Sequence, residues 1–486
     1  MLQNCLPNRV RQKLSELPKT LDETYERVLK EIGKADGNLA LRILQCLTVA
    51  SRPLRVEELA ELLALDFEEA EGRIPKFNED WRLQDRHQAL LITCSSLIAI
   101  VDDHGSPVVQ FSHFSVKEFL TSERLSTPVR DISSFHILPE PAHATLAQAC
   151  LAVLLCLDDS IPKKRVRSSF PLAHYAAQHW VDHAQFEEVS LRVEDGMQLL
   201  FDQSKPYFSA WLRLHNIDAR NHLYLDWYGP ATKPDAAPLY YASLCGFRDL
   251  VEHLVFKNPG YINARFGRHH SPLAAALHNR HFRVAELLYQ HNADIELASD
   301  TNWTLLADGH VDAVQWLLAR GANVNLQRND DRPPFPESGW MQCKPNEIID
   351  TASNSPLHLA AAFDRFKTVQ LLIQCGADVT ARNNSDLTPL HLALSKGKGD
   401  CIQLLVQHGA DVNARDKGGF TPLHLASSRR RPDLIPVLIQ HGADINARNN
   451  GKSTPLHLAL LRVSAKTVHL FVLFWADITW TGLQLA

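Results

Sequence analysis

The 486-residue sequence contains no CxxC pair, no GxSxG or HExxH motif, and no apolar run long enough to cross a bilayer. Its nine cysteines are scattered and odd in number, which argues against a disulfide framework or a zinc ribbon and favours reduced thiols. The longest apolar runs, 146–157 and 470–476, are shorter than the ~20 residues of a membrane-spanning helix. The first residues, MLQNCLPNRVRQ, lack the apolar core of a signal peptide. We therefore expect a cytoplasmic protein, with the nucleus as the alternative, and no membrane partner.

The composition is that of a soluble globular protein. Hydrophobic residues make up 45% of the chain and charged residues 22%, which is enough apolar material for a core. The length is sufficient for about three domains. The net charge of −5 does not demand nucleic acid or an anionic membrane as a partner. A nucleic-acid partner is therefore the weaker alternative.

One hexapeptide recurs in the second half of the chain. TPLHLA occurs at 388–393, 421–426 and 454–459, and SPLHLA occurs at 355–360, so that equivalent residues lie 33 apart. Each copy continues into GADV, GADI or WADI, two weaker copies start at 237 and 271, and a shortened copy covers 304–325. A period of 33 with these residues is typical of ankyrin repeats. The sequence thus predicts seven copies from about 237 to the end.

Each copy has the signals of a helix pair. In the copy that begins at 421, Thr421 is placed to cap the first helix and Pro422 occupies its first turn. Gly442 is the expected left-handed stop of the second helix, after which ADINARN extends into a hairpin. The second helix has an apolar stripe made of Leu434, Val437, Leu438 and Ile439. Because one copy cannot bury its own stripe, the copies are expected to stack.

The histidine of each hexapeptide is predicted to be structural. Equivalent positions in stacked helix pairs lie roughly 8–10 Å apart, whereas two nitrogens on one zinc ion lie within about 4 Å of each other. These histidines therefore cannot share a metal. Each follows its Ser or Thr cap by three residues, where a ring nitrogen can bond to the backbone at the junction between copies. The four histidines are His358, His391, His424 and His457.

The resemblance to ankyrin repeats implies a protein partner that contacts the hairpin tips and the inner helices. The surface is basic with one aromatic, so an acidic partner segment is expected; the alternative is that these are solvated loop charges. Lys452 stands where Gly419 stands in the preceding copy, a departure from the usual glycine. The predicted partner-binding residues are Arg382, Asn384, Asp386, Leu387, Lys396, Arg415, Lys417, Phe420, Arg429, Arg430, Arg448, Asn450 and Lys452.

Three features depart from a regular stack. Pro436 lies inside a predicted second helix and should remove a hydrogen bond or bend that helix. The segment 328–353 is rich in proline and acids and is expected to be a protruding loop. The last copy ends without a polar capping helix, so that end is expected to be truncated or covered by a partner.

The first half of the chain predicts helices and one β-hairpin. Helices are expected at 17–32, at about 38–50, within 51–65 after a short extended piece, at 85–96 and from 115, with capping boxes from Thr20 to Glu23 and from Ser115 to Glu118. LIAIVDD and VVQFSH flank the turn HGSP and alternate as hairpin strands do. Three helices followed by a hairpin indicate a winged helix. With this largely helical first half and the ankyrin-repeat solenoid that follows it, the chain is predicted to be mainly α.

This half resembles the part of fungal NACHT–ankyrin proteins that follows their NTPase, a branch of the STAND NTPases. The matching segments are LPKTLDETYERVL, RPLRVEELAE, SSLIAIVDD, VVQFSHFSVKEFL and PLAHYAAQHWVDHA. The resemblance implies that the repeats are a sensing or partner-binding arm. It also implies four parts: a helical segment at 1–50 after a missing NTPase, a winged helix at 51–126, a helical connector at 127–234 and ankyrin repeats at 235–486.

No enzymatic or cofactor site is predicted. A P-loop requires GxxxxGK[ST], and Gly451-Lys452-Ser453 is preceded at the required position by Asn446 instead of glycine. His179 and His183 lie one helical turn apart without a third ligand, so they are expected to be surface or core histidines. The crowded histidines at 269, 270, 278, 281 and 291 are expected to be exposed. No small-molecule substrate is evident.

Three functions remain as hypotheses. The first is a non-enzymatic scaffold that binds a partner protein with the concave face of the repeats. The second is the regulatory half of a STAND NTPase whose catalytic domain is not in this chain. The third is a DNA-binding regulator, although the segment 85–96 offers only Arg86 and His87 as basic groups. KKRVR at 163–167 is either a nuclear-import signal or, as expected here, a solvated loop.

Overall fold

The computed structural model describes residues 20–35, 37–67, 74–82, 85–125, 132–158, 160–218, 237–265, 267, 269–296, 309–327, 353–396, 399–429, 431–461 and 466–473. The predicted loop at 328–353, apart from its last residue, and the chain from 474 onward lie outside these ranges. The chain forms two compact units, one of residues 1–238 with 249–254 and one of residues 239–248 with 255–486. Both are mainly helical, which confirms the predicted fold class.

The first unit begins with two helices, α2 (Leu21–Ala35) and α3 (Gly37–Val49). The predicted cap of α2 is present, because the Thr20 Oγ1 accepts a hydrogen bond of 3.2 Å from the backbone N–H of Glu23. Tyr25, Leu29 and Ile32 recur at helical spacing and are buried. This face packs α2 against α3 and the helix α6 described next.

A winged-helix arrangement follows α3. Strand β5 (Ser106–Phe111) pairs antiparallel with both β1 (Leu54–Arg55) and β4 (Ile98–Asp103), giving the order β1-β5-β4. The sequence did not predict a second small sheet, in which β2 (Leu65–Asp66) pairs with β3 (Lys76–Phe77). The helical elements are α4 (Val56–Ala60), η2 (Glu61–Ala64), η3 (Glu79–Trp81), α5 (Arg86–Cys94), η4 (Ser95–Leu97) and α6 (Phe114–Leu120).

The start of α6 corrects one prediction. The N-cap residue is His113 and not Ser115, because the His113 ring accepts a hydrogen bond from the backbone N–H of Ser115. The Ser115 hydroxyl lies 2.8 Å from the Tyr25 hydroxyl on α2. The serine therefore links two helices instead of capping one.

The rest of the first unit is a helical bundle around α7 (Pro139–Leu154), of which most residues are buried. Trp180, Phe201 and Trp211 contact one another, and the Trp211 indole N–H donates to the Ala177 carbonyl. KKRVR was expected in a loop but lies entirely on α8, where Val166 is buried. The other elements are η5 (Glu123–Leu125), η6 (Ser133–Phe135), α8 (Lys163–Ser169), α9 (Ala173–Ala184), α10 (Val189–Arg192), α11 (Glu194–Leu200) and α12 (Tyr207–Leu214).

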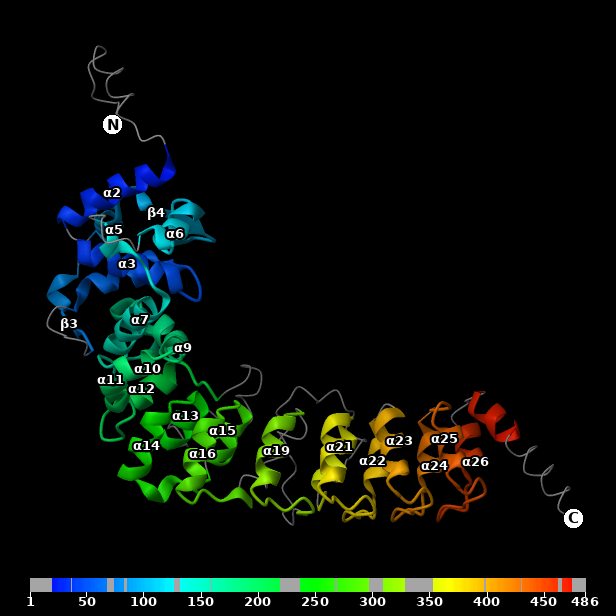
Figure 1. Cartoon of the computed structure of the whole chain (residues 1–486). Helices are drawn as coiled ribbons and strands as arrows, with labels where there is room; N and C mark the ends of the chain where they lie inside the picture. Colours follow the sequence, from blue (N-terminus) through cyan, green and yellow to red (C-terminus); the bar gives the residue numbers. More distant parts are fainter. Residues whose placement is uncertain are drawn as a thin grey trace, which may run out of the picture. The chain divides into compact units, whose positions relative to one another are not determined.

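The repeat copies fold into helix pairs that follow one another, with the connecting hairpins along one edge (Figure 1). They bury a continuous apolar core that runs through consecutive copies. One short helix, η7 (Pro259–Tyr261), lies in the first connection, and a further helix covers 466–473. The helices are α13 (Pro238–Cys245), α14 (Arg248–Lys257), α15 (Pro272–His278), α16 (Phe282–Gln290), α19 (Val311–Ala319), α20 (Pro356–Ala362), α21 (Phe366–Gln374), α22 (Pro389–Lys396), α23 (Gly399–Gln407), α24 (Pro422–Ser428), α25 (Ile435–Gln440) and α26 (Pro455–Leu461).

Two features at the ends of the second helices follow from the residues there. Gly442 has φ of 87°, which is the left-handed stop that the sequence predicts. Pro436 does not bend its helix as expected, because α25 begins at Ile435 and the proline falls in the first turn. A proline there removes no intrahelical bond. Helix α25 is therefore shorter than α23, with six residues against nine.

The described cysteines, among them Cys46, Cys150 and Cys401, form no disulfide, and most of them are buried. Within the described ranges, no helix combines the length and the apolar character that a bilayer crossing requires.

Candidate functional site

The hexapeptide histidines connect consecutive copies. In His424, Nδ1 lies 3.1 Å from the backbone N of Thr421, which donates to it, and 2.9 Å from the Thr421 hydroxyl oxygen. On the other side of the ring, Nε2 lies 3.0 Å from the Ser453 carbonyl oxygen in the next hairpin. His391 makes the same contacts to Thr388 and Phe420. His358 makes them to Ser355 and Leu387. The predicted role at the junction is confirmed for these three of the four histidines.

These contacts require the neutral ring with its proton on Nε2, because Nδ1 accepts from a backbone N–H and Nε2 donates to a carbonyl. His358, His391 and His424 are buried, and burial lowers the pKa of each. For His358 the pKa falls to about 4. At neutral pH the rings therefore hold the helix start and the next hairpin together without carrying a charge.

Asparagines form a second link between copies. The Asn413 side chain donates from Nδ2 to the Gly442 carbonyl at 2.8 Å and accepts from the Asp444 backbone N–H at 2.7 Å. Asn325 makes the same pair of bonds to Gly376 and Asp378. The copy that lies between these two has Thr380 at the equivalent position. The Thr380 hydroxyl bonds instead to Asp378 in its own hairpin. The asparagine link to the next copy is therefore missing at this position.

Side chains at the hairpin tips form a third ladder. The Gln327 amide donates to the Arg382 carbonyl at 3.1 Å, and the Arg382 guanidinium donates to the Arg415 carbonyl at 2.8 Å. Arg415 in turn donates to the Arg448 carbonyl at 2.5 Å. Each guanidinium has five N–H donors, so the bond to the next tip leaves most of them available to a ligand. The tips are therefore held in register while their charged groups stay exposed.

The tips of three consecutive hairpins place most of the predicted partner-binding residues on one edge. Asp386, Leu387 and Phe420 are half-buried. Phe420, expected to be an exposed aromatic, packs edge-on against His424, with ring centroids 5.8 Å apart. The Lys396 side chain and Arg430 lie outside the described part of the chain. The exposed members are Arg382, Asn384, Arg415, Lys417, Arg429, Arg448, Asn450 and Lys452.

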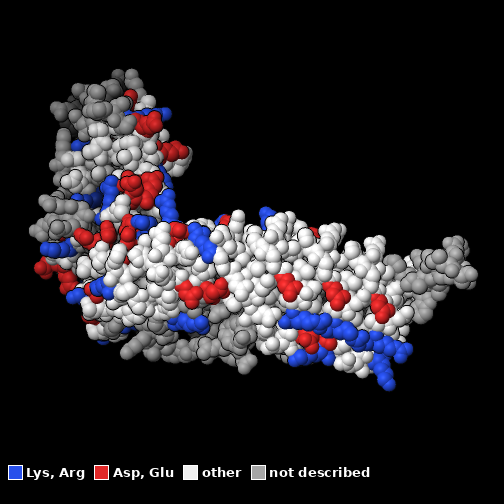
Figure 2. Space-filling model, turned by 60° about the horizontal axis from the view of Figure 1, so that its bottom comes forward, with Lys and Arg blue, Asp and Glu red and all other residues white. Residues whose placement is uncertain are grey.

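We call the exposed cations of these tips the basic band: Arg382, Arg415, Lys417, Arg448 and Lys452. Figure 2 shows Lys and Arg gathered into a continuous stripe over the later repeat copies, with acidic residues in separate spots beside it. Within the described residues, no carboxylate forms an ion pair with the band. The exposed Asp378, Asp411 and Asp444 belong to the same hairpins, and each accepts a bond from the backbone N–H two residues later.

A small pocket in the first unit contains a buried ion pair. Glu61 Oε1 lies 2.9 Å from Arg82 Nη2, and Glu61 Oε2 accepts from the Leu172 backbone N–H at 2.6 Å. The same guanidinium donates to the Ser169 carbonyl and lies over the rings of Phe77 and Phe170.

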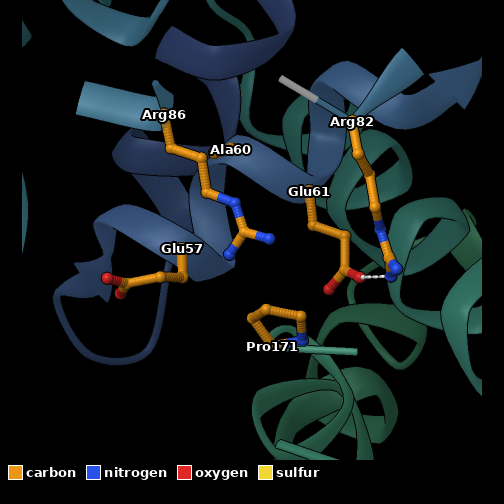
Figure 3. A pocket seen from close by; sticks show the side chains of 6 residues that line it. All are labelled: Glu57, Ala60, Glu61, Arg82, Arg86 and Pro171. Atoms are coloured by element: carbon orange, nitrogen blue, oxygen red, sulfur yellow. Dashed lines mark hydrogen bonds and ion pairs between the residues drawn. The ribbon is translucent and has the colours of Figure 1, made fainter. Parts of the chain in front are cut away.

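Burial raises the pKa of Glu61 to about 7, although the charges of Arg82 and Arg86 oppose this. In Figure 3 the two arginines lie on opposite sides of the carboxylate, and Pro171 faces it. The other two residues that line the pocket are Glu57 and Ala60. Both carboxylate oxygens of Glu61 have protein partners, so this side chain connects η2 to the helical bundle. The carboxylate therefore has a structural role that requires no ligand in the pocket.

The other histidine predictions have mixed outcomes. His183 is a core histidine, as expected: Nε2 lies 2.8 Å from the Tyr175 hydroxyl and Nδ1 lies 2.9 Å from Nδ1 of His143. Exposure was wrong for His269 and His278, which are buried with their rings stacked at 4.1 Å. Among the described residues, no group of three or more His, Cys, Asp or Glu is arranged to hold a metal ion.

Helix α5 presents apolar side chains where a DNA-reading winged helix would present cations. Leu91 is 42% exposed and Ile92 is 71% exposed. Arg86 lines the pocket beside Glu61, and the His87 side chain lies outside the described part of the chain. This surface is poorly suited to phosphate contacts.

Comparison with protein families agrees with this geometry. A model of ankyrin repeats (3 copies) matches residues 237–328, 340–416, 357–449 and 415–479. The second half of the chain consists of ankyrin repeats. A model of the GPI inositol-deacylase winged helix domain matches residues 25–130 and thus takes in α2 and α3. Both matched domains are non-catalytic, and their combination is consistent with fungal NACHT–ankyrin proteins.

Two curated fungal proteins are similar to this chain. The azaphilone pigments biosynthesis cluster protein L of Monascus ruber is 32% identical over 58% of this chain and 61% of its own length. The vegetative incompatibility protein HET-E-1 of Podospora anserina is 26% identical over 35% of this chain and 13% of its own length. The chain thus spans less than two thirds of either relative.

Several residues that organise the ankyrin hairpins were not predicted from the sequence. Asn325, Asn413 and Gln327 link consecutive copies, yet in the sequence they are ordinary polar residues of a loop. The signal that could have found them is their recurrence at the same place after the left-handed stop, since Asn325 and Asn413 each follow the glycine by four residues.

Proposed function

We propose that this chain is a non-enzymatic interaction scaffold whose ankyrin hairpin tips and inner helices bind a partner protein. The observation that carries the proposal is the set of exposed polar and charged side chains at equivalent places of consecutive tips, which the guanidinium and histidine bonds hold in register. A rigid row of this kind presents a binding surface at little cost in conformational entropy. Ankyrin repeats support a protein-interaction role in general.

The proposed contact residues are the predicted set, with the basic band as its charged centre. The band favours a partner segment that carries carboxylates, because opposite charges steer association and fix its register. The alternative, that each cation is merely solvated, predicts that substitutions at the tips leave partner binding unchanged.

A second candidate is the regulatory part of a STAND NTPase. It is supported by the winged-helix match and by the similarity to HET-E-1. Under this proposal the first unit contacts an NTPase domain, and the repeats sense a ligand protein. A search of the genomic sequence upstream of Met1 for an in-frame GxxxxGK[ST] distinguishes this candidate from a free-standing scaffold.

Site-specific photocrosslinking tests the scaffold proposal. A photoreactive amino acid is placed at Asn384 or Asn450 on the tips and, as a matched control, at Gln403, which is exposed on the second helix α23. We expect discrete protein adducts from the tip positions in native cell extract and none from Gln403. Equal adduct patterns from all three positions would contradict the proposal.

A further inference from the structure

The three arginines of the basic band occupy the same place in consecutive hairpins. Arg382, Arg415 and Arg448 lie 33 residues apart in sequence. Adjacent tips are joined by backbone hydrogen bonds, from Lys417 N–H to the Ser385 carbonyl at 3.2 Å and from Asn450 N–H to the Gly418 carbonyl at 3.0 Å. The backbone of each tip is therefore held against the next one, and the guanidinium groups of Arg382 and Arg415 each bond to the following tip.

The spacing of this row follows from helix packing, because each copy adds one helix pair to the stack. Packed helices lie roughly 8–10 Å apart, so consecutive arginines are separated by about the same distance. An extended peptide advances about 3.3 Å per residue, so three of its residues cover the same distance.

The charges beside the row limit the class of ligand. Asp378, Asp411 and Asp444 lie in the same hairpins and are exposed. A nucleic-acid duplex, which is broad and negatively charged on its whole surface, would meet this acidic row together with the arginines. A single extended polypeptide is narrow enough to follow the cations alone.

Lys452 provides an independent observation. Its φ is 59°, in the left-handed region, at the hairpin position that Gly419 occupies with φ of 74°. Glycine adopts this conformation without the steric cost that a side chain incurs. Asp386 adopts the same conformation at the equivalent place of the first tip, with φ of 58°. This position is thus occupied by a carboxylate, a glycine and a lysine in turn, so the tips become more positive from the first to the last.

We propose that the basic band binds an extended acidic segment of a partner protein, with one carboxylate at about every third residue facing Arg382, Arg415 and Arg448. Lys417 and Lys452 lie at the last two of these tips, so the segment is most acidic at the end that contacts them. The proposal rests on the proposed partner-binding function and specifies the chemistry of its ligand.

Fluorescence anisotropy with synthetic peptides tests the spacing. A labelled peptide of repeated Ser-Glu-Pro has a carboxylate at every third residue, and its prolines favour a conformation that advances about 3.1 Å per residue. A peptide of the same composition with its glutamates adjacent is the control, and a helical peptide with glutamates seven residues apart has the same charge spacing. At low salt we expect the Ser-Glu-Pro peptide to bind the full chain about five-fold more tightly than either. Equal affinities, or a preference for the helical peptide, would overturn the proposal.

Substitutions then locate the site. R415Q and K417Q should each weaken binding of the Ser-Glu-Pro peptide about two- to five-fold, as expected for exposed ion pairs, whereas R283Q, an exposed arginine on α16 of the same unit, should not. Unchanged affinity in both R415Q and K417Q would refute the assignment. Lys417 is exposed and its side chain is not part of the guanidinium ladder, so K417Q keeps the test valid if R415Q unfolds. If the tips still crosslink a protein while no peptide binds, the peptide proposal fails alone; if neither occurs, the proposed function fails too.

Discussion

The two halves of the chain are stabilised by polar contacts of different range. In the repeats, the junction histidines bond to carbonyls 29 residues further along the chain, and the same bond recurs in three consecutive copies. In the first unit, Leu172 bonds to Glu61 across 111 residues and Ser51 bonds to Tyr175 across 124. Each of these longer contacts occurs once. A recurring contact can be recognised in a sequence, whereas a contact that occurs once becomes visible only in the fold.

This difference also predicts how strongly a substitution in each half lowers the free energy of unfolding. Removing a contact from one copy weakens one junction of a stack in which each copy contacts its neighbours. Removing one partner of the buried ion pair in the first unit leaves the other charge uncompensated inside a bundle. The largest effects are therefore expected in the first unit.

Arg82→Met should be the most damaging change. It leaves the Glu61 carboxylate buried without its ion-pair partner, which we expect to cost about 3–5 kcal/mol of unfolding free energy at pH 8. The folded-state pKa of Glu61 is about 7, above its unfolded value, so ionisation destabilises the fold as the pH rises through this range. The loss should therefore be smaller at pH 5, where the carboxyl is protonated. Urea unfolding at both pH values measures this.

Arg192→Met is the matched control, because Arg192 forms a more exposed ion pair with Glu140 at 2.8 Å in the same unit. We expect a loss below about 1 kcal/mol there. Similar losses in the two variants would contradict the role of burial.

His424→Ala should lower the unfolding free energy of the repeats by about 2–3 kcal/mol, because it leaves a backbone N–H and a carbonyl at a buried junction without their partner. His457 occupies the same place in the last TPLHLA hexapeptide but is exposed. His457→Ala should therefore cost less than about 1 kcal/mol. Thermal unfolding followed by circular dichroism distinguishes them, and equal losses would refute the importance of the buried junction.

Acid should weaken the repeats through the same rings. The folded-state pKa of His358 is about 4, below its unfolded value, so its stabilising contribution is complete above pH 6.5 and is lost as the pH falls toward 4. At pH 5 this one group accounts for a loss of at most about 2 kcal/mol. His358→Gln should reduce the dependence of the unfolding free energy on pH between 7 and 5. An unchanged dependence would assign the acid sensitivity to other groups.

Thr380→Asn should be mildly stabilising, because it restores the asparagine link that Asn325 and Asn413 make at the equivalent positions. A gain of about 1 kcal/mol is expected from two added hydrogen bonds, less the cost of ordering the side chain. Thr380→Ser, which retains a hydroxyl, should leave the unfolding free energy nearly unchanged. If the asparagine variant is no more stable than the serine variant, the link contributes nothing.

The sequence was sufficient for most of the repeat architecture. The 33-residue period, the left-handed stop at Gly442 and the junction role of His424 all follow from local signals that recur. Where a local signal had two solutions, the prediction failed: Pro436 lies in the first turn of α25, which begins at Ile435, instead of bending the helix. The alternation around the turn HGSP was likewise enough to place β4 and β5.

Long-range partners could not be predicted. Nothing near Glu61 in the sequence identifies Arg82 or Leu172 as its partners. Likewise, nothing in the sequence shows that the rings of His269 and His278 stack on each other in the buried interior. The set of partner-binding residues came from the family resemblance; the structure places most of it on one edge, and its role in binding stays a proposal.

Hydrogen–deuterium exchange of the full chain, with and without a partner identified by crosslinking, tests the central claim most directly. We predict that the partner slows exchange at the tips 382–387, 415–420 and 448–453 and leaves α5 and the second helices α21 and α23 unchanged. Slower exchange confined to α5 or to those second helices, with the tips unaffected, would contradict the account.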